Sequence, residues 1–181
     1  MHRSPSFIFL LFASFLWIFK SILLSGCLEK ESNVFVFILL LRQISRWYLF
    51  LDKKRQYSCA YFKDESDSLE TAQENKINHI IKKLNIQTNQ KVLDIGSGWG
   101  SLAIDIAKKT KASVTGITLS ENQLKYSQEK AKELNLDNQV EFKLADYRQL
   151  DEKFDRIVSV GMFEHVGKKF YRTYFNKVFK M

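Results

Sequence analysis

Cysteine is scarce in this sequence, which contains only Cys27 and Cys59, far apart along the chain. Two cysteines at that separation do not suggest the disulfide scaffold of a small secreted domain, so a reducing compartment is the default expectation. Internal repeats and low-complexity linkers are also absent from the sequence. With 181 residues, the chain is expected to contain one domain, because about 150 residues per domain is usual.

Acidic residues are outnumbered by basic residues in this sequence. Lysine and arginine together number 28, against 20 aspartates and glutamates, and the sequence pI is about 9.4. A basic chain favours an anionic partner, either a nucleic acid or an acidic membrane surface. The basic residues are spread along predicted helix faces, and no recognised nucleic-acid-binding motif is present, so no nucleic-acid partner is expected.

Residues 1–48 differ in composition from everything after them. Residues 7–24 are apolar apart from one lysine and two serines, and residues 34–41 form a second, shorter apolar run. The first run is barely long enough to cross a bilayer, and Lys20 would lie within it. No small-x-small cleavage site follows. Three interpretations of this apolar segment stay open: a membrane anchor, a signal peptide, or a non-native N-terminus such as a misassigned start.

From residue 49 to residue 181, apolar runs typical of strands alternate with amphipathic patterns typical of helices. The expected strands are residues 91–95, 113–117, 139–144 and 155–160, and the expected helices are residues 69–84, a segment that follows residue 100, and residues 121–135 and 168–180. Strands that alternate with helices of about 10–15 residues indicate a parallel, doubly wound sheet. The predicted fold is therefore α/β, with a Rossmann-like sheet preceded by an apolar helical segment.

Residues 91–100, with the sequence Lys-Val-Leu-Asp-Ile-Gly-Ser-Gly-Trp-Gly, are the most informative stretch of the chain. An apolar run with an acid near its end, followed by glycine at every second position, predicts a strand that enters a tight loop. Leu102 and Ile106 recur at helical spacing after it, so the loop opens a helix. Glycines let backbone N–H groups approach a ligand closely, and a helix N-terminus favours a carboxylate or another anionic group. The stretch therefore predicts a ligand-binding loop.

The spacing of these residues separates two classes of cofactor. A dinucleotide-binding fingerprint needs glycine or alanine at position 101 and an acid about 20 residues further on for the ribose. This chain has Ser101, and its next expected strand ends in Thr118-Leu119-Ser120 with no acid. The loop instead resembles the first motif of class I S-adenosylmethionine-dependent methyltransferases. The residues that form this pattern are Asp94, Gly96, Gly98 and Gly100.

Ser120 and Gln123 form a predicted capping box at the start of the expected helix 121–135. The serine oxygen is placed to accept a hydrogen bond from the third helical N–H, and Gln123 is placed to reach back to the serine N–H. Thr118 and Gln123 also lie at the carboxyl edge of the predicted sheet, where ligands bind in open α/β folds. Capping and ligand contact are not exclusive there, so both roles stay open.

Two carboxylates follow the later strands. Asp146 ends the third strand, where it is placed either to accept a hydrogen bond from an adenine amino group or to cap a turn. Glu164 follows the fourth strand, beside His165 and between two glycines, in the position expected of catalytic machinery. A surface position is the alternative for Glu164. His165 is better explained as a packing or hydrogen-bonding residue than as a base.

Aromatic residues make up 14% of the chain, and two groups of them bear on function. Tyr57 is singled out as an aromatic face for a sulfonium cation. The expected helix 168–180 carries aromatic residues on one side and basic residues on the other. A basic amphipathic helix can lie on an anionic bilayer. A helix packed on the sheet with a solvated basic face explains the same pattern, so both interpretations stay open.

Residues 49–181 resemble the cyclopropane-fatty-acyl-phospholipid synthase family, which includes the mycolic acid cyclopropane synthases. The resemblance rests on several separate motifs in the family's order. These are Tyr57-Ser58-Cys59-Ala60-Tyr61-Phe62, Leu69-Glu70 with Ala72-Gln73 and Lys76, the glycine loop, residues 116–120 with Gln123, Asp146-Tyr147-Arg148, and residues 154–167. Plant N-methyltransferases of the coclaurine kind are similar around the same motifs, so methyl transfer to a small amine is the alternative function.

The resemblance implies transfer of the methyl group of S-adenosylmethionine to a cis double bond of a phospholipid acyl chain. A bound bicarbonate ion then removes a proton and a cyclopropane ring closes. The resemblance places Cys59, through its backbone, and Glu164 at the bicarbonate. It assigns cofactor contacts to Tyr57, Ser58, residues 92–100, Thr118, Leu119, Ser120, Gln123, Tyr147 and Arg148. The expected partner is the surface of an unsaturated phospholipid membrane, the expected location is cytoplasmic and peripheral to that membrane, and no metal is expected.

Three departures from the family pattern bear on these expectations. Ser97 stands where the family usually has cysteine, which is a mild change. The apolar residues 1–48 replace the His-Tyr-Asp segment that normally precedes the tyrosine motif. The sequence stops at Met181, whereas the family pattern continues with further strands and catalytic residues. The expectation is a partial methyltransferase domain with little turnover, and a membrane-associated cofactor-binding remnant without turnover also stays open.

Overall fold

The computed structural model describes residues 51–181, so the expectations for the apolar segment 1–48 lie outside the described residues. In the described part, four parallel strands form one sheet in the order β3-β2-β1-β4. Their bounds are β1 Lys91–Ile95, β2 Ser113–Thr118, β3 Val140–Leu144 and β4 Arg156–Val158. Leu93 of β1 aligns with Thr115 on one side and with Ile157 on the other. The predicted parallel α/β sheet is confirmed.

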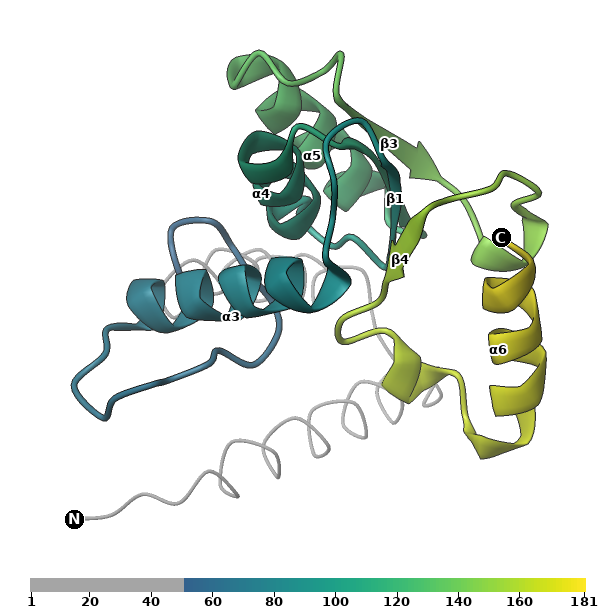
Figure 1. Cartoon of the computed structure of the whole chain (residues 1–181), viewed down its shortest axis with the longest axis horizontal. Coiled ribbons are helices and arrows are strands. Elements are labelled where there is room, and N and C mark those ends of the chain that lie inside the picture. The colour runs from purple at the N-terminus through teal and green to yellow at the C-terminus, as the bar shows by residue number, and fades with distance from the viewer. Residues whose placement is uncertain (1–50) are drawn as a thin grey trace, which may run out of the picture. The chain divides into compact units, whose positions relative to one another are not determined.

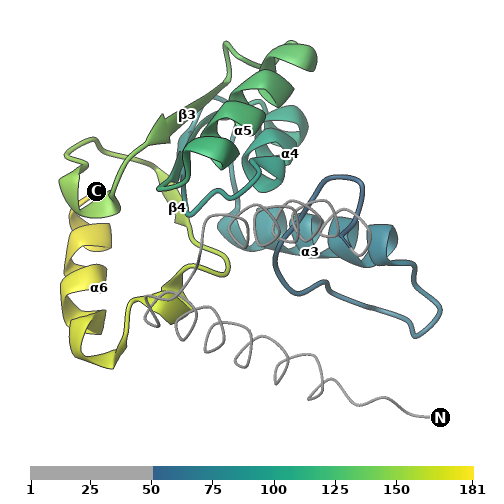
Figure 2. The same cartoon turned by 180° about the vertical axis from the view of Figure 1, so that it is seen from behind.

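Four α-helices and three short 3-10 turns accompany this sheet in residues 51–181. The helices are α3 Leu69–Leu84, α4 Ser101–Thr110, α5 Glu121–Glu133 and α6 Tyr171–Lys180, and the turns are Tyr147–Gln149, Phe163–His165 and Lys168–Phe170. Figure 1 shows α4 and α5 together on one side of the sheet and α6 on the other. The reverse view in Figure 2 agrees, so both faces of the sheet are covered.

Alternation of side chains along β1 divides the core into two layers. Val92 packs among apolar residues of α3, α4 and α5, whereas Leu93 and Ile95 pack on the opposite face with Met181 at the end of α6. Successive strand residues point to opposite faces, so a strand covered on both faces requires consecutive apolar residues. Asp94 departs from that rule, because it is buried in the same strand.

Some predicted boundaries are wrong. β4 ends at Val158 rather than at residue 160, and the next residue, Ser159, donates its hydroxyl to the carbonyl of Ile95 at 3.1 Å. α5 ends at Glu133, and Asn135 beyond it has a positive φ of 55°. The expected helix 168–180 begins as a 3-10 turn and becomes α-helical only at Tyr171.

No helix within residues 51–181 has the length and apolar character needed to cross a membrane. Across the same residues, no group of three or more histidine, cysteine, aspartate and glutamate side chains is arranged to hold a metal ion.

Candidate functional site

A cleft of about 840 Å³ lies at the carboxyl ends of the strands, where open α/β sheets bind their ligands. The loops after all four strands contribute to it, together with residues 55–58 and a side chain of α3. The predicted cofactor contacts that line the cleft are Tyr57, Ser58, Asp94, Gly96, Gly98, Thr118, Leu119, Gln123, Asp146, Tyr147 and Arg148. Gly100 and Ser120 were predicted with them but are not part of the lining.

Gly98 is the glycine of the loop that faces open space. Its φ is +55°, and a Cβ built there would meet no atom within 4 Å. A Cβ on Gly100 would instead lie 2.7 Å from Cζ of Phe142, and one on Gly96 would lie 2.7 Å from Cβ of Met162. Gly96 and Gly100 are therefore needed for close packing, whereas Gly98 leaves room for a ligand to approach the backbone.

Hydrogen bonds to β2 hold the glycine loop in place. The N–H groups of Gly96 and Ser97 both donate to the carbonyl of Ile117, at 3.0 and 2.9 Å. The hydroxyl of Ser97 donates to the same oxygen at 3.2 Å, and the N–H of Gly100 donates to the carbonyl of Ser97 at 2.9 Å. These contacts turn the chain so that the first residues of α4 border the cleft. A helix N-terminus in that position favours an anionic group.

Asp94 is a buried carboxylate that borders the cleft. Only 2% of the residue is exposed, burial raises its pKa to about 7, and Oδ2 has no hydrogen-bond partner among the described residues. A buried polar atom without a partner costs about 1–3 kcal/mol unless a ligand or water supplies the missing donor. The carboxylate therefore suits a ligand that carries N–H or O–H donors or a positive charge.

The predicted capping box at α5 is half right. Ser120 caps the helix as expected, because its hydroxyl oxygen accepts from the N–H of Gln123 at 3.4 Å. The expected return contact is wrong, since Oε1 of Gln123 accepts from the hydroxyl of Thr118 at 2.7 Å. The N–H of Ser120 instead donates to Oγ1 of Thr118 at 3.2 Å. Ser120 is thus a cap outside the cleft lining, whereas Thr118 and Gln123 form a linked polar pair within it.

Asp146 both caps a turn and borders the cleft. Its Oδ1 accepts from the N–H of Arg148 at 2.9 Å, which caps the turn Tyr147–Gln149, and its Oδ2 accepts from Nε of Arg148 at 2.9 Å. The hydrogen bonds from Arg148 lower the pKa of Asp146, so the carboxylate stays an ionised acceptor. The turn-capping interpretation is confirmed, and contact with an adenine amino group stays a prediction.

The segment 52–58 reaches the cleft because charged side chains attach it to α3, α4 and α5. The ammonium of Lys54 pairs with Asp105 of α4 at 2.7 Å. The guanidinium of Arg55 lies 4.1 Å from the centre of the Tyr126 ring of α5. A cation over an aromatic face is attracted by the ring quadrupole. These contacts hold the segment beside the glycine loop, with its tyrosine and serine in the cleft wall.

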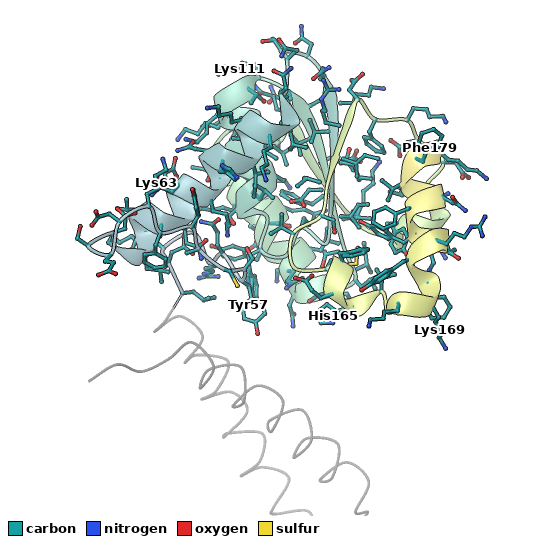
Figure 3. The ribbon with its side chains drawn as sticks, turned by 60° about the horizontal axis from the view of Figure 1, so that its bottom comes forward. Tyr57, Lys63, Lys111, His165, Lys169 and Phe179 are labelled. Atoms are coloured by element: carbon teal, nitrogen blue, oxygen red, sulfur yellow. The ribbon has the colours of Figure 1, made fainter. Side chains whose placement is uncertain are left out.

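The two predicted catalytic residues lie outside the lining. Cys59 and Glu164 are both exposed and border the cleft only through their sequence neighbours. His165 is part of the lining, as is Tyr57, although the two are far apart in the sequence, and Figure 3 labels both at the same edge of the view. The catalytic roles of Cys59 and Glu164 therefore stay predictions.

Sequence reasoning missed several residues of the cleft as functional candidates. They are Arg55, Gln56, Lys76 and Met162. The signal for Lys76 was present, because this lysine lies among the apolar positions of the amphipathic helix 69–84 and would have to be buried with them. Met162 lies within the family motif of residues 154–167 but was given no role, and Arg55 and Gln56 carry no pattern in the sequence, since only the packing of their loop brings them to the cleft.

With this geometry established, comparison with known proteins places the chain in a family. Residues 45–181 match the model of the family described as mycolic acid cyclopropane synthetase. The chain belongs to this family. It is 52% identical over 125 residues to the cyclopropane-fatty-acyl-phospholipid synthase of Escherichia coli, an alignment that covers 69% of this chain and 31% of that relative.

Solved structures support membership of the mycolic acid cyclopropane synthetase family. A mycolic acid cyclopropane synthase complexed with SAH and CTAB has a TM-score of 0.70 at 37% identity, covering 74% of this chain and 47% of the other. Coclaurine N-methyltransferase bound to N-methylheliamine and SAH has a TM-score of 0.70 at 34% identity, covering 76% and 40%. The chain thus spans about a third of the Escherichia coli relative and less than half of each of these structures.

Proposed function

We propose that the chain binds S-adenosylmethionine in the cleft and serves methyl transfer to unsaturated phospholipid acyl chains, as in cyclopropane fatty acid synthesis. The observation that carries this proposal is the open face of Gly98 beside the unpartnered Oδ2 of Asp94. The open space at Gly98 admits a ligand to the loop backbone, and the unpartnered oxygen of Asp94 needs a hydrogen-bond donor from that ligand. S-adenosylmethionine offers an ammonium group, ribose hydroxyls and a carboxylate, so the residues present fit it.

Three side chains have the chemistry to hold separate parts of this cofactor. The carboxylate of Asp94 has the chemistry to accept from its ammonium group or hydroxyls, and Asp146, held ionised by Arg148, has the chemistry to accept from the adenine amino group. Tyr57, which is 53% exposed in the cleft wall, offers an aromatic face to the sulfonium. When bound, S-adenosylmethionine supplies an electrophilic methyl group.

The wall formed after β4 suits an acyl chain. Met162, Val166 and Phe170 are apolar residues of that wall. An alkene is an uncharged and weak nucleophile, so a protein helps it mainly by positioning the double bond and excluding water. We infer that these residues hold the acyl chain against the glycine loop. The greater identity to the phospholipid synthase than to the coclaurine N-methyltransferase supports a lipid substrate over a small amine.

Bicarbonate is proposed as a second small ligand on the family resemblance alone, with Cys59 and Glu164 as its contacts. The described residues do not by themselves form a site for it. Neither residue lines the cleft, and the carboxylate of Glu164 repels an anion unless donors from other segments surround it. The backbone N–H of Cys59 is one such donor. The role of bicarbonate as proton acceptor therefore depends on groups beyond those described.

The surface of α6 supports the proposal of a phospholipid membrane as partner. Tyr174 packs inward and is 5% exposed, whereas Phe175 is 56% and Phe179 is 93% exposed. Basic residues lie along the same helix and the turn before it, namely Lys168, Lys169, Arg172, Lys177 and Lys180. Exposed aromatic rings beside basic groups suit an anionic bilayer surface. A cytoplasmic location at the periphery of such a membrane follows from this partner.

Two measurements test the proposed function. Calorimetric titration of the purified chain with S-adenosylhomocysteine checks the cofactor site directly. Incubation with S-adenosylmethionine, bicarbonate and vesicles of unsaturated phosphatidylglycerol, followed by mass spectrometry, detects acyl chains that have gained one CH2 group. We expect cofactor binding, and transfer that is directed to the lipid but shows little turnover. A folded chain that binds no cofactor, or one that methylates small amines and leaves the lipid untouched, would contradict the proposal.

A further inference from the structure

Lys76 is a buried lysine that faces the cleft from α3. Only 8% of the residue is exposed, and its ammonium donates a hydrogen bond to Oγ of Ser58 at 2.7 Å. Both residues line the cleft. Among the described residues Lys76 forms no ion pair, and the carboxylate of Asp52 attracts its ammonium without a hydrogen bond. Lys76 is therefore held by a serine hydroxyl rather than by an opposite charge.

Burying an ammonium without an ion pair is costly, because water solvates a charge far better than a protein interior does. Burial accordingly lowers the pKa of Lys76 to about 8, while Asp52 and the Cys59 thiol act in the opposite sense. A methionine would fill the same space on this helix face without that cost. The contact with Ser58 thus needs an explanation beyond packing.

The neighbouring turn of α3 makes a second contact with the same serine. Nε2 of Gln73, which is 3% exposed, donates to the backbone carbonyl of Ser58 at 3.0 Å. Positions 73 and 76 are three residues apart and so lie on one face of the helix. Two donors from α3 therefore fix both the backbone and the side chain of Ser58.

The direction of the hydrogen bond decides what Ser58 can offer to a ligand. An ammonium has three donors and no acceptor, so it must occupy a lone pair of the serine oxygen. The hydroxyl proton of Ser58 is then directed away from Lys76. Because the serine lies in the cleft wall, that proton is available to an acceptor in the cleft. A hydroxyl polarised by an adjacent ammonium is a good donor to an anion.

We propose that Lys76 is a positioning residue that fixes Ser58 as a hydroxyl donor to the carboxylate of the cofactor's amino-acid portion. The inference rests on the proposed function, because the carboxylate belongs to S-adenosylmethionine and its product. It assigns Lys76 no contact with the reacting atoms. The positive charge of Lys76 acts through the serine hydroxyl and adds favourable potential for an anion at this end of the cleft.

Two ligands that differ in the carboxylate-bearing portion test the proposal. S-adenosylhomocysteine has this portion, and 5′-methylthioadenosine has the same nucleoside without it. Calorimetry should show that Lys76→Met weakens S-adenosylhomocysteine binding about ten-fold or more, the loss expected for a hydrogen bond to a charged group. Binding of 5′-methylthioadenosine should change less than about two-fold, below the effect of one ordinary hydrogen bond. Lys76→Met removes a buried charge, so the variant should keep its thermal stability.

A double variant separates action through Ser58 from direct contact with the ligand. Ser58→Ala should weaken the binding of S-adenosylhomocysteine as much as Lys76→Met does. The combined variant should bind this ligand no more weakly than either single variant. The ratio of wild-type to Lys76→Met affinity should also fall between pH 7 and 9, as Lys76 loses its proton. Taking this ratio cancels titration of the ligand's own amino group.

Each contrary result has a distinct meaning. Equal losses for both ligands would overturn the proposal in favour of a structural role, and additive losses would overturn it in favour of direct contact. Unchanged affinity in Lys76→Met would also overturn it. If the folded wild-type chain binds neither ligand, the proposed function fails first and the positioning role fails with it.

Discussion

The hydroxyl of Thr118 donates to Oε1 of Gln123 at 2.7 Å, so two residues that frame the start of α5 are joined across its cap. A different contact caps the helix, namely that of the Ser120 hydroxyl with the N–H of Gln123, so ligand binding and helix capping can be tested with separate variants. Thr118→Val should release the amide of Gln123 into the cleft and weaken S-adenosylhomocysteine roughly two- to ten-fold, the range for one neutral hydrogen bond. Calorimetry at neutral pH measures this loss.

Ser120→Ala is the matched control for that variant. Ser120 caps α5 but does not line the cleft, so its loss should lower the free energy of unfolding by about 0.5–2 kcal/mol and leave ligand affinity nearly unchanged. Urea denaturation gives the stability of both variants. If Ser120→Ala weakens ligand binding more than Thr118→Val does, then Ser120 contacts the ligand. The assignment of Ser120 to helix capping alone would then be incorrect.

Gly98 should be the most sensitive position of the glycine loop. Asparagine adopts left-handed backbone conformations more readily than other side chains, so Gly98→Asn should fold while its side chain occupies the open space where the ligand approaches. We expect binding of S-adenosylhomocysteine to fall below detection by calorimetry. Ser97→Cys, one residue earlier, should bind as the wild type does, because Ser97 is buried and its hydroxyl donates to the carbonyl of Ile117 rather than to a ligand. Full affinity in a folded Gly98→Asn variant would show that the glycine loop is not part of the ligand site.

Asp94 should make stability depend on pH. Its pKa in the folded chain is about 7, against 3.8 for an unperturbed aspartate, because burial penalises the charged form. The stability that its protonated form contributes is fully present below pH 3.8 and is lost as the pH rises to about 7. The isosteric variant Asp94→Asn has no carboxyl group to ionise at this position, so it does not lose stability in this way as the pH rises.

Urea denaturation of wild type and Asp94→Asn from pH 4 to pH 8 measures the effect. The variant should become progressively more stable relative to wild type up to about pH 7, and the difference should then level off. A difference that does not change with pH would mean that Asp94 ionises equally easily in the folded and unfolded chains. The same carboxylate accepts a ligand donor in the proposed site, so the variant should also bind S-adenosylhomocysteine more weakly.

Phe179 should contribute to membrane binding. It is 93% exposed near the end of α6, between Lys177 and Lys180, so Phe179→Ser should reduce binding to phosphatidylglycerol vesicles without loss of stability. Binding should weaken as salt rises, because the lysines act through screened charges. Vesicle sedimentation measures it, with Leu134→Ser, another exposed apolar residue, as the control. Equal binding by both variants and wild type would exclude this face of α6 as the membrane contact.

Sequence reasoning recovered the order of strands and helices because strand-like and helix-like patterns alternate along the chain and the glycine spacing is local. It also identified most of the cleft, since the carboxyl ends of parallel strands must meet at one edge. It failed at the end of β4, which stops at Val158, because the apolar pattern of the sequence continues past the last paired residue. It failed again at Gln123, whose amide prefers the hydroxyl of Thr118 to the N–H of Ser120.

The parallel α/β sheet, the glycine loop and the family can all be inferred from the sequence, because each depends on local order along the chain. The packing of the fold sets which glycine faces open space, since Gly96 and Gly100 are enclosed by Met162 and Phe142 while Gly98 is open. The same holds for Lys76, whose contact with Ser58 joins residues 18 positions apart. Packing sets such contacts through distances between segments, and no local spacing in a sequence records those distances.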